Sequence, residues 1–344
     1  MKHKNLRFAI VALAGSLAAC TGAPNGAPND QATAGFFHDK TVTYIVSTDP
    51  GGNYDAYGRL IAGYMEKHLP GARVLIKNVP GAGHIIGANQ IYNAKPDGLT
   101  IGTFNTGLIY AQILNRNGVR FDLADMSYLG KAAAEPRALV LSKTSPYQSF
   151  SELQNAGQAV KMAASGVGSA AYAETRLISD AFQLNVDLIN GYGGNSGEMA
   201  MLRGEVQGQL ASLSSLQRFV ASGDGRVVLQ IGGSPVDGAA SARELASSEV
   251  ARDIVDLILS QAELARITAG PPGIPPDRLR ELRAAYRAAL EDPELLAESE
   301  KRGLPIEPLY GEEVQERVVA ALNQSPQTRA LIAKAMSVDE SGLP

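Results

Sequence analysis

The stretch TVTYIVSTDPGGNYDAYGRLIAGYMEKHLPGARVLIKNVPGAG, residues 41–83, decides the fold class of this chain. It begins with a β-branched run, Thr41–Ser47, and a glycine-rich turn follows at residues 49–52. An amphipathic helix is predicted over Asp55–Leu69, because apolar residues recur there at helical spacing. A second strand, Arg73–Lys77, ends in another glycine-rich turn. This order of strand, glycine turn, helix and strand predicts a parallel α/β sheet.

The same order recurs further along the chain. Val160–Ala164 is a predicted strand that turns through Ser165–Ser169 into a helix. Val186–Ile189 is another, and Gly191–Ser196 leads from it into the next helix. The sequence therefore predicts an α/β protein of two units, and a length of 344 residues agrees with about two domains. Beyond Ser247 the pattern is mainly helical, and periodicity does not decide where this C-terminal segment docks.

The first residues have the pattern of an export signal. A basic start precedes an apolar run of about twelve residues, which is shorter than the roughly twenty that span a bilayer. Residues 17–20 (LAAC) resemble a bacterial lipobox, so we expect 1–19 to be a lipoprotein signal peptide and Cys20 to carry the lipid. An ordinary signal peptide with an incidental cysteine is the alternative. Residues 20–36, rich in Ala, Gly, Pro and Asn, are expected to be a flexible tether. The protein is thus predicted to be exported and anchored to a membrane on its periplasmic or extracytoplasmic face.

Charge and residue content argue against several function classes. Loss of the signal peptide removes three positive charges from a chain whose formal net charge is −4. The remaining protein is therefore acidic and lacks the excess of positive charge that is typical of nucleic-acid-binding proteins. A single cysteine precludes an intramolecular disulfide and Cys-based zinc sites. The sequence has no paired histidines at metal-ligand spacing, no P-loop and no GxSxG elbow. We therefore expect no metal, no cofactor and no catalytic residues, and the protein is not expected to be an enzyme.

Glycine-rich turns between strand and helix are the candidate ligand sites. Ligands of α/β sheets bind beyond the carboxyl ends of the strands, where glycine lets backbone N–H groups approach and the helix N-terminus adds partial positive charge. Four turns fit this description, two in each unit: Asp49–Asp55, Asn78–His84, Ser165–Ser169 and Gly191–Ser196. Each alone is equally consistent with a tight turn, but together they favour a ligand cleft between the units.

Two side chains in these turns have more than one interpretation. His84 is either a ligand contact or a solvated residue at a helix N-terminus. Asp55 either binds a cationic ligand group or, as we favour, accepts hydrogen bonds from backbone N–H groups at the start of its helix.

The loops resemble those of the extracytoplasmic solute receptors of tripartite tricarboxylate transporters, also called Bug-type receptors. Residues 50–55 (PGGNYD) are similar to the family's PGGxxD loop, and residues 78–83 (NVPGAG) to its NxPGAG loop. Residues 96–100 (PDGLT) match its PDGxT turn, and residues 269–276 (AGPPGIPP) are similar to its APxGTPx stretch. The resemblance covers nearly all of residues 40–325, and two loop motifs in the family's order make it specific.

The resemblance implies a two-domain periplasmic binding protein of the type II, Venus flytrap architecture, with its ligand cleft between the domains. Domain I would comprise approximately residues 37–138 plus 259–344, and domain II residues 139–258. Such a receptor captures a small carboxylated organic solute and delivers it to a membrane permease of the tripartite tricarboxylate type. We expect it to act as a monomer held to the membrane through the lipid on Cys20.

The site residues are carried over from the family by position. One carboxylate would be held by the first two loops, and the second domain would close the other end of the cleft. The candidate ligand-binding residues are Ser47, Thr48, Asp49, Gly51, Gly52, Asn53, Asp55, Gly81, Ala82, Gly83, His84, Asn105, Thr106, Ser165, Gly168, Ser169, Tyr192 and Asn195.

This chain also departs from the family pattern. Residues 47–49 (STD) stand where the family has Pro and an aromatic or small residue, His84 replaces a glycine of GAGG, and Gly193 replaces a common lysine. Asp49 would repel a carboxylate unless it points away. The expected ligand is therefore a mono- or dicarboxylate, with an amino acid or a larger aromatic acid as alternatives.

The same cleft also suits a second class of protein, a ligand-presenting sensor or docking lipoprotein without a transport role. A surface-anchored hydrolase is the third and least favoured class, because it needs a nucleophile with a base in reach and no such constellation occurs in the sequence.

Overall fold

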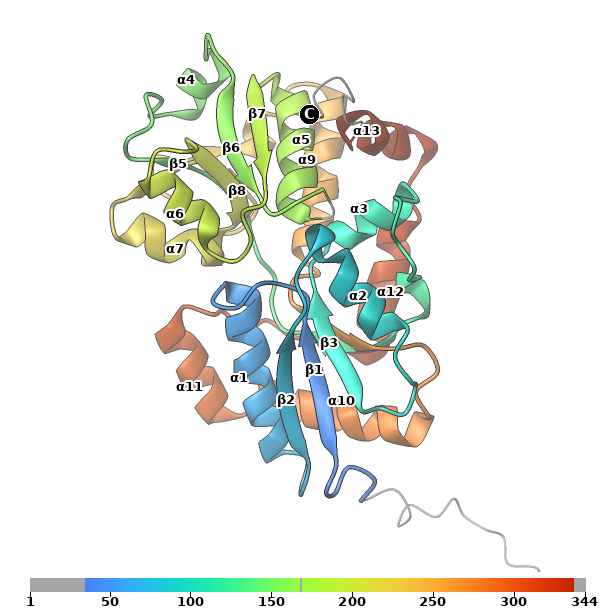
Figure 1. The fold of residues 1–344 in the computed structure, drawn as a ribbon. Helices are drawn as coiled ribbons and strands as arrows, with labels where there is room; N and C mark the ends of the chain where they lie inside the picture. The colour runs from blue at the N-terminus through green and yellow to red at the C-terminus, as the bar shows by residue number, and fades with distance from the viewer. Residues whose placement is uncertain (1–34, 168, 337–344) are drawn as a thin grey trace, which may run out of the picture. The chain divides into compact units, whose positions relative to one another are not determined.

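Two six-stranded sheets organise the protein, and each is the centre of one lobe (Figure 1). The computed structural model describes residues 35–167 and 169–336. The predicted signal peptide, the predicted lipidation site Cys20, most of the predicted tether, the ligand candidate Gly168 and residues 337–344 lie outside these ranges. The first lobe contains, in sheet order, β12 (Leu309–Tyr310), β4 (Ser127–Lys131), β11 (Ile267–Gly270), β3 (Thr100–Phe104), β1 (Thr41–Val46) and β2 (Arg73–Asn78). The second contains β10 (Ala240–Ser241), β9 (Gly225–Ile231), β5 (Arg137–Ser142), β8 (Gly208–Ser212), β6 (Val160–Ala164) and β7 (Val186–Asn190).

Each sheet has a parallel part and an antiparallel part. The parallel part was predicted from the sequence: β1 pairs with β2 and β3, and β6 pairs with β7 and β8. The antiparallel part is a difference from the all-parallel sheets that the sequence predicts. Strand β11 lies antiparallel between β3 and β4, and β5 lies antiparallel between β8 and β9. The chain enters β5 and β11 from the opposite lobe, so neither strand belongs to a local strand-turn-helix pattern that the sequence could reveal.

Two short segments between the lobes run side by side. The chain passes to the second lobe between Lys131 and Arg137 and returns between Ala262 and Ile267. The Glu135 N–H donates to the Ala262 carbonyl at 2.9 Å, and the Ala132 N–H donates to the Arg266 carbonyl at 3.2 Å. The two connections therefore form one paired hinge-like crossing.

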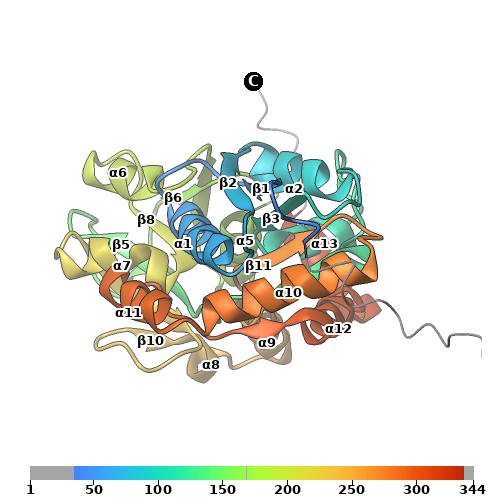
Figure 2. The ribbon, with the colours of Figure 1, turned by 90° about the horizontal axis from the view of Figure 1, so that it is seen from below.

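The core of the first lobe lies between its sheet and its long helices. Tyr44, Tyr57 and Met65 are buried together with Tyr286, and the Tyr44 hydroxyl is bonded to the Thr268 hydroxyl at 2.6 Å. Figure 2 shows α1, α10 and α11 grouped on this lobe. The helical elements of this lobe are α1 (Asn53–Lys67), η1 (Ala82–His84), α2 (Ile85–Tyr92), α3 (Gly107–Ile113), η2 (Leu123–Asp125), α10 (Pro276–Leu290), α11 (Pro293–Arg302) and α12 (Gly311–Leu322).

The second lobe includes the last described helix of the chain. Helix α13 (Pro326–Met336) packs against α5 and α9, and buries Ile332 and Met336 in the same core as Ile178 and Ile258. The C-terminal segment therefore crosses back from the first lobe after α12 (Figure 1). The other helices of this lobe are α4 (Phe150–Gln154), α5 (Ala170–Phe182), α6 (Ser196–Leu202), α7 (Leu213–Ala221), α8 (Ala242–Leu245) and α9 (Glu249–Ala262). Within the described ranges, no helix is both long and apolar enough to cross a bilayer.

Candidate functional site

The four predicted glycine turns meet between the lobes. The turns after β1 and β2 come from the first lobe, and those after β6 and β7 come from the second. They enclose two adjoining cavities of about 90 and 310 Å³, here called the first and second cavity. Both cavities are lined by Thr48, His84, Ser165 and Gly194, so they are parts of one cleft. The cleft thus lies at the carboxyl ends of the parallel strands, as expected for an α/β sheet.

The lobes are closed on each other across this cleft. The Asn53 side-chain amide donates to the Ser214 hydroxyl at 3.2 Å, and the Ala170 N–H donates to Oδ1 of Asn105 at 3.0 Å. A Cβ atom added at Gly52 would lie 2.9 Å from Cα of Gly194, closer than van der Waals contact permits. The absence of a side chain at Gly52 therefore allows the two backbones to touch.

Asp55 fixes the shape of the first loop. Its carboxylate accepts hydrogen bonds from the Gly51 N–H at 3.0 Å, from Nε of Arg59 at 2.9 Å and from Nδ2 of Asn78 at 3.0 Å. Nδ2 of Asn78 also donates to the Thr48 carbonyl at 3.1 Å, which ties the second loop to the first. Burial opposes ionisation of Asp55, but the hydrogen bonds from Arg59, Gly51 and Asn78 outweigh it and lower its pKa. Its bonds to the backbone and to Arg59 agree with the structural role that we favoured from the sequence.

The second loop has an unusual backbone conformation. Gly81, Ala82, Gly83 and His84 have successive φ values of 121°, 46°, 60° and 81°. Ala82 and His84 are not glycines, and each such residue costs on the order of 1–3 kcal/mol, a form of strain that is concentrated at functional sites. The result is that the loop turns its backbone and the His84 ring into the cleft.

His84 is a neutral, partly shielded contact of both cavities. Its ring lies 6.1 Å from the ring of Tyr54, centre to centre, and its Nδ1 atom is buried without a hydrogen-bond partner among the described residues. Burial lowers the pKa of His84 to about 4, so the imidazole is uncharged at neutral pH. An uncharged imidazole offers one donor and one acceptor to a ligand.

Arg266 joins the lobes behind the first cavity. Its Nε and Nη2 atoms donate to the carboxylate of Glu135 at 3.0 and 2.8 Å, and Nη2 also reaches the Ser212 hydroxyl at 3.3 Å. The guanidinium carbon lies 4.0 Å from the ring centre of Tyr54 and 4.9 Å from that of Tyr57. The two connections of the paired crossing therefore meet helix α1 and strand β8 at one buried cation.

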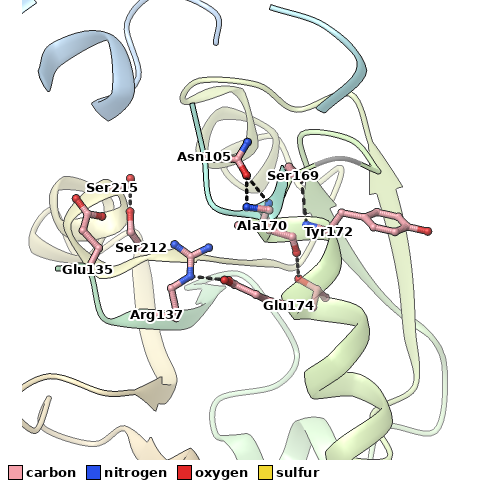
Figure 3. Close-up of polar contacts among 12 residues, drawn as sticks. Asn105, Glu135, Arg137, Ser169, Ala170, Tyr172, Glu174, Ser212 and Ser215 are labelled. Carbon is pink, nitrogen blue, oxygen red and sulfur yellow. Dashed lines mark hydrogen bonds and ion pairs between the residues drawn. The ribbon is translucent and has the colours of Figure 1, made fainter. Parts of the chain in front are cut away.

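Arg137 and Asn105 line the first cavity from different lobes, and Figure 3 shows the polar contacts that each of them makes. Arg137 is paired with the buried carboxylate of Glu174 through Nε at 2.5 Å. Oδ1 of Asn105 accepts from the Gly107 N–H at 2.7 Å and from the Ala170 N–H, which leaves its Nδ2 atom buried and unpartnered among the described residues. Asn105 thus presents a free donor from the first lobe opposite an arginine of the second.

Two unpartnered acceptors also line the first cavity. Oε2 of Glu198 on α6 and Oε1 of Gln209 on β8 are buried and have no hydrogen-bond partner in the described part of the chain. Burial raises the pKa of Glu198 to about 6. Buried polar atoms are usually paired, so unpaired ones of both kinds around one cavity indicate a binding site for a polar ligand.

The structure brings most of the predicted site residues together. Those that line the cavities are Ser47, Thr48, Asp49, Gly52, Asn53, Gly81, Ala82, Gly83, His84, Asn105, Ser165 and Ser169. Gly51, Asp55, Thr106, Tyr192 and Asn195 do not line them. The Tyr192 hydroxyl instead donates to Glu205 at 3.2 Å.

Sequence reasoning missed the lining residues that come from outside the glycine turns. Arg137 begins β5, and Gln209 and Ser212 belong to β8, where no motif marks a site. Tyr54 lies within the predicted turn at residues 49–55, and Glu198 lies two residues after the turn at residues 191–196, so closeness to these turns was the signal that could have found them. Among the described residues, no group of three or more His, Cys, Asp or Glu side chains is placed to hold a metal ion.

Comparisons with known proteins agree with this architecture. A family profile described as "Tripartite tricarboxylate transporter family receptor" matches residues 58–336. A UPF0065 protein from the tcbD-tcbE intergenic region of Pseudomonas sp. strain P51 is 27% identical over 191 residues, which cover 54% of this chain and 56% of that relative. The solved structure of the periplasmic binding protein BugD has a TM-score of 0.72 at 21% identity, over 86% of this chain and 97% of that one. MatC from Rhodopseudomonas palustris with bound malate has a TM-score of 0.67 at 22% identity, over 86% and 98%. These likenesses confirm the predicted two-domain, type II periplasmic-binding fold.

Proposed function

The chain belongs to the receptor family of tripartite tricarboxylate transporters, and on this premise we propose that it captures a small carboxylated organic solute and delivers it to a membrane permease. Members of this family are solute-binding receptors and not enzymes. The proposal goes beyond family membership in three respects: the solute carries a carboxylate, it is delivered to a permease, and particular residues contact it.

The observation that carries the proposal is the set of polar atoms from both lobes that line one closed cleft and have no hydrogen-bond partner among the described residues. Nδ2 of Asn105 and Nδ1 of His84 come from the first lobe, and Oε2 of Glu198 and Oε1 of Gln209 come from the second. The Asn105 amide is a donor that suits a carboxylate, whose oxygens accept hydrogen bonds only. The malate bound by MatC supports the same ligand class.

Closure would couple binding to recognition by the permease. Thr48, Asn53 and His84 belong to the first lobe, whereas Ser165, Ser169 and Arg137 belong to the second, so one solute would contact both lobes and hold them together. A ligand that binds only the closed form shifts the population toward it. The permease would then distinguish the loaded receptor by its closed shape.

Asp49 is proposed to limit the size and charge of the solute at the second cavity. It lines this cavity, and its Oδ2 atom would lie 2.0 Å from a Cβ atom added at Gly193. The carboxylate therefore occupies the space that a side chain at residue 193 would need. A solute carboxylate is expected to sit nearer Asn105 and Arg137, away from this negative charge.

Export and lipid anchoring remain part of the proposal. The periplasmic location of family members supports an extracytoplasmic site of action, and residues 1–20 supply the signal and the candidate lipidation site. We propose that the receptor is a monomer with a domain I of about residues 37–138 plus 259–344 and a domain II of about residues 139–258, with two changes to these predicted bounds. Helix α13 and the residues of β5 from Arg137 onward belong to the second lobe.

Native mass spectrometry of the purified protein tests the binding proposal. We expect a co-purified or added carboxylate to be retained, and we expect saturation at about 100 times Kd to raise the free energy of unfolding by roughly 2.7 kcal/mol. An acid panel that gives neither bound mass nor thermal shift would contradict solute binding. Loss of uptake of the identified solute on deletion of the gene would support delivery, whereas unchanged uptake would favour a sensor or docking role.

A further inference from the structure

Glu198 is a half-buried glutamate of the proposed binding site and has no cationic partner among the described residues. It lines the first cavity from α6, and its Oε2 atom has neither solvent contact nor a hydrogen-bond partner among the described residues. The two arginines near this cavity already have their own acids, since Arg137 pairs with Glu174 and Arg266 with Glu135. A carboxylate oxygen withdrawn from solvent is stabilised by a donor or a cation, and a bound ligand can supply one.

Gln209 places a second acceptor beside the same helix. It is buried on β8, and its Oε1 atom also lacks a partner in the described part of the chain. Oε1 would lie 2.2 Å from a Cβ atom added at Gly197, the residue before Glu198, so the amide packs directly against the start of α6. Two oxygen acceptors from adjacent elements therefore line one cavity, a combination that suits a donor with several hydrogens.

The two acceptors are separated along strand β8 from the position that faces Arg137. Arg137 pairs with Ser212 in the ladder of β5 and β8, whereas Gln209 is three residues earlier on β8. At roughly 3.3 Å per residue, the two positions lie about 10 Å apart along the strand. The cavity thus has the donor groups of Arg137 and Asn105 at one position, and at another it has acceptors without a partner among the described residues. This arrangement suits a ligand that carries both acceptor and donor groups.

We propose that the solute is a zwitterion, whose protonated amine is received by Glu198 and Gln209 while its carboxylate lies toward Arg137 and Asn105. This inference rests on the proposed function, because it assumes that a carboxylated solute occupies the cleft. It narrows that solute from any small organic acid to an amino acid or related amino-carboxylate. Glu198 is then the residue that selects for the amine.

Calorimetry on the full-length protein with matched acids tests the proposal. The probes are three pairs that differ only by an amine: succinate and aspartate, glutarate and glutamate, butanoate and 4-aminobutanoate. For at least one pair we expect the amino member to bind about tenfold tighter or more, the typical effect of a hydrogen bond to a charged group. Glu198→Gln keeps the size of the side chain and removes its charge, and should bring the two members of that pair to within about threefold.

Control variants separate a specific effect from a folding defect. Glu244→Gln changes an exposed glutamate of the same lobe and should leave the preference unchanged. Gln209→Leu removes the second acceptor and should also reduce the preference for the amine. The melting temperature of each variant without ligand reports whether the fold is intact.

Several outcomes would overturn the inference. One is tighter binding of the member without the amine in every pair, and another is a preference that survives Glu198→Gln. Acid binding that strengthens as the pH falls through about 6 would mean that a protonated Glu198 donates to a carboxylate. Binding of the plain acids alone overturns only this inference, whereas the absence of binding by all six probes also counts against the proposed function.

Discussion

Asp55 is the residue whose removal should most directly disorder the first loop. Its carboxylate accepts three hydrogen bonds, from Gly51, Arg59 and Asn78, and it is buried. We expect Asp55→Ala to lower the free energy of unfolding by about 2 kcal/mol, because buried donors lose their partner. Urea denaturation measures the change. Asp253→Ala, at an exposed position of α9, is the matched control and should change stability little.

The same carboxylate makes a pH-dependent contribution. The pKa of Asp55 is lower in the folded protein than its ordinary value near 3.8, so its stabilising effect is fully present above that value. It is lost as the pH falls through the folded pKa, because protonation then removes the acceptor charge. Below about pH 4 the stability of the wild type should fall more steeply than that of Asp55→Ala. Parallel curves for the two proteins between pH 4 and 2 would contradict this role.

The buried pair of Arg266 and Glu135 should respond differently to single and double replacement. Glu135→Leu leaves the guanidinium buried without its acid, which typically costs about 3–5 kcal/mol. Adding Arg266→Met removes the orphaned charge, so the double variant should be more stable than Glu135→Leu. Denaturation midpoints of the variants give the comparison. A double variant that loses the sum of both single effects would show that the two side chains act independently.

At this scale the sequence predicted the loop residues of the site but not the residues that face them. The loops were recognisable because glycine, proline and small residues stand in a fixed order at residues 50–55 and 78–83. Arg137, Gln209 and Ser212 reach the cleft from β5 and β8, and only the pairing of these distant strands places them there. The residues around a strand in the sequence do not show which distant strand it pairs with.

Helix α13 lies near the end of the chain, yet it should contribute substantially to the stability of the second lobe. Ile332 is fully buried in the core that also contains α5 and α9. We expect Ile332→Ala to destabilise the protein by about 2–5 kcal/mol through loss of buried methyl groups and the resulting cavity. Gln327→Ala, at an exposed position of the same helix, should have little effect. An equal response of both variants to urea would mean that α13 detaches in solution.

The elements themselves were predictable wherever strand, turn and helix follow each other locally. Strands β1, β2, β6 and β7 were predicted from β-branched runs that end at glycine turns. Strands β4 and β12 were not predicted, since their place at the edge of the first sheet depends on β11, which arrives from the other lobe. Periodicity left the docking of α13 open, because an amphipathic helix specifies that it packs but not on which lobe. The domain bounds implied by the family resemblance placed it in domain I, whereas it packs in the core of the second lobe.

For the whole molecule, the relevant equilibrium is opening and closing about the paired crossing at residues 132–136 and 262–266. The contacts between the lobes include the side chains of Asn53 and Ser214, Asn105 with the Ala170 N–H, and the backbones of Gly52 and Gly194. A solute that contacts both lobes should shift the population further toward the closed form. In small-angle scattering we expect a smaller radius of gyration on addition of a solute that calorimetry has identified.

Gly52→Ala should obstruct closure without harming either lobe. The φ angle of Gly52 is −84°, which alanine adopts without strain, but its Cβ atom would lie 2.9 Å from Cα of Gly194 in the other lobe. The variant should therefore unfold at a similar urea concentration to the wild type, bind the solute about tenfold more weakly or worse, and keep the larger radius of gyration with ligand present. Its expected loss of affinity corresponds to about 1.4 kcal/mol of closure free energy.

Gly63→Ala provides the matched control, because a Cβ atom there meets nothing within 4 Å and the residue lies inside the same helix, α1. It should leave both affinity and closure unchanged, and should raise stability by up to about 1 kcal/mol by removing a helical glycine. If Gly52→Ala bound the solute as tightly as Gly63→Ala and closed to the same radius, contact of the two glycine turns would not be needed for binding. The solute would then be held by side chains of a more open cleft, and closure would not be the signal that a permease detects.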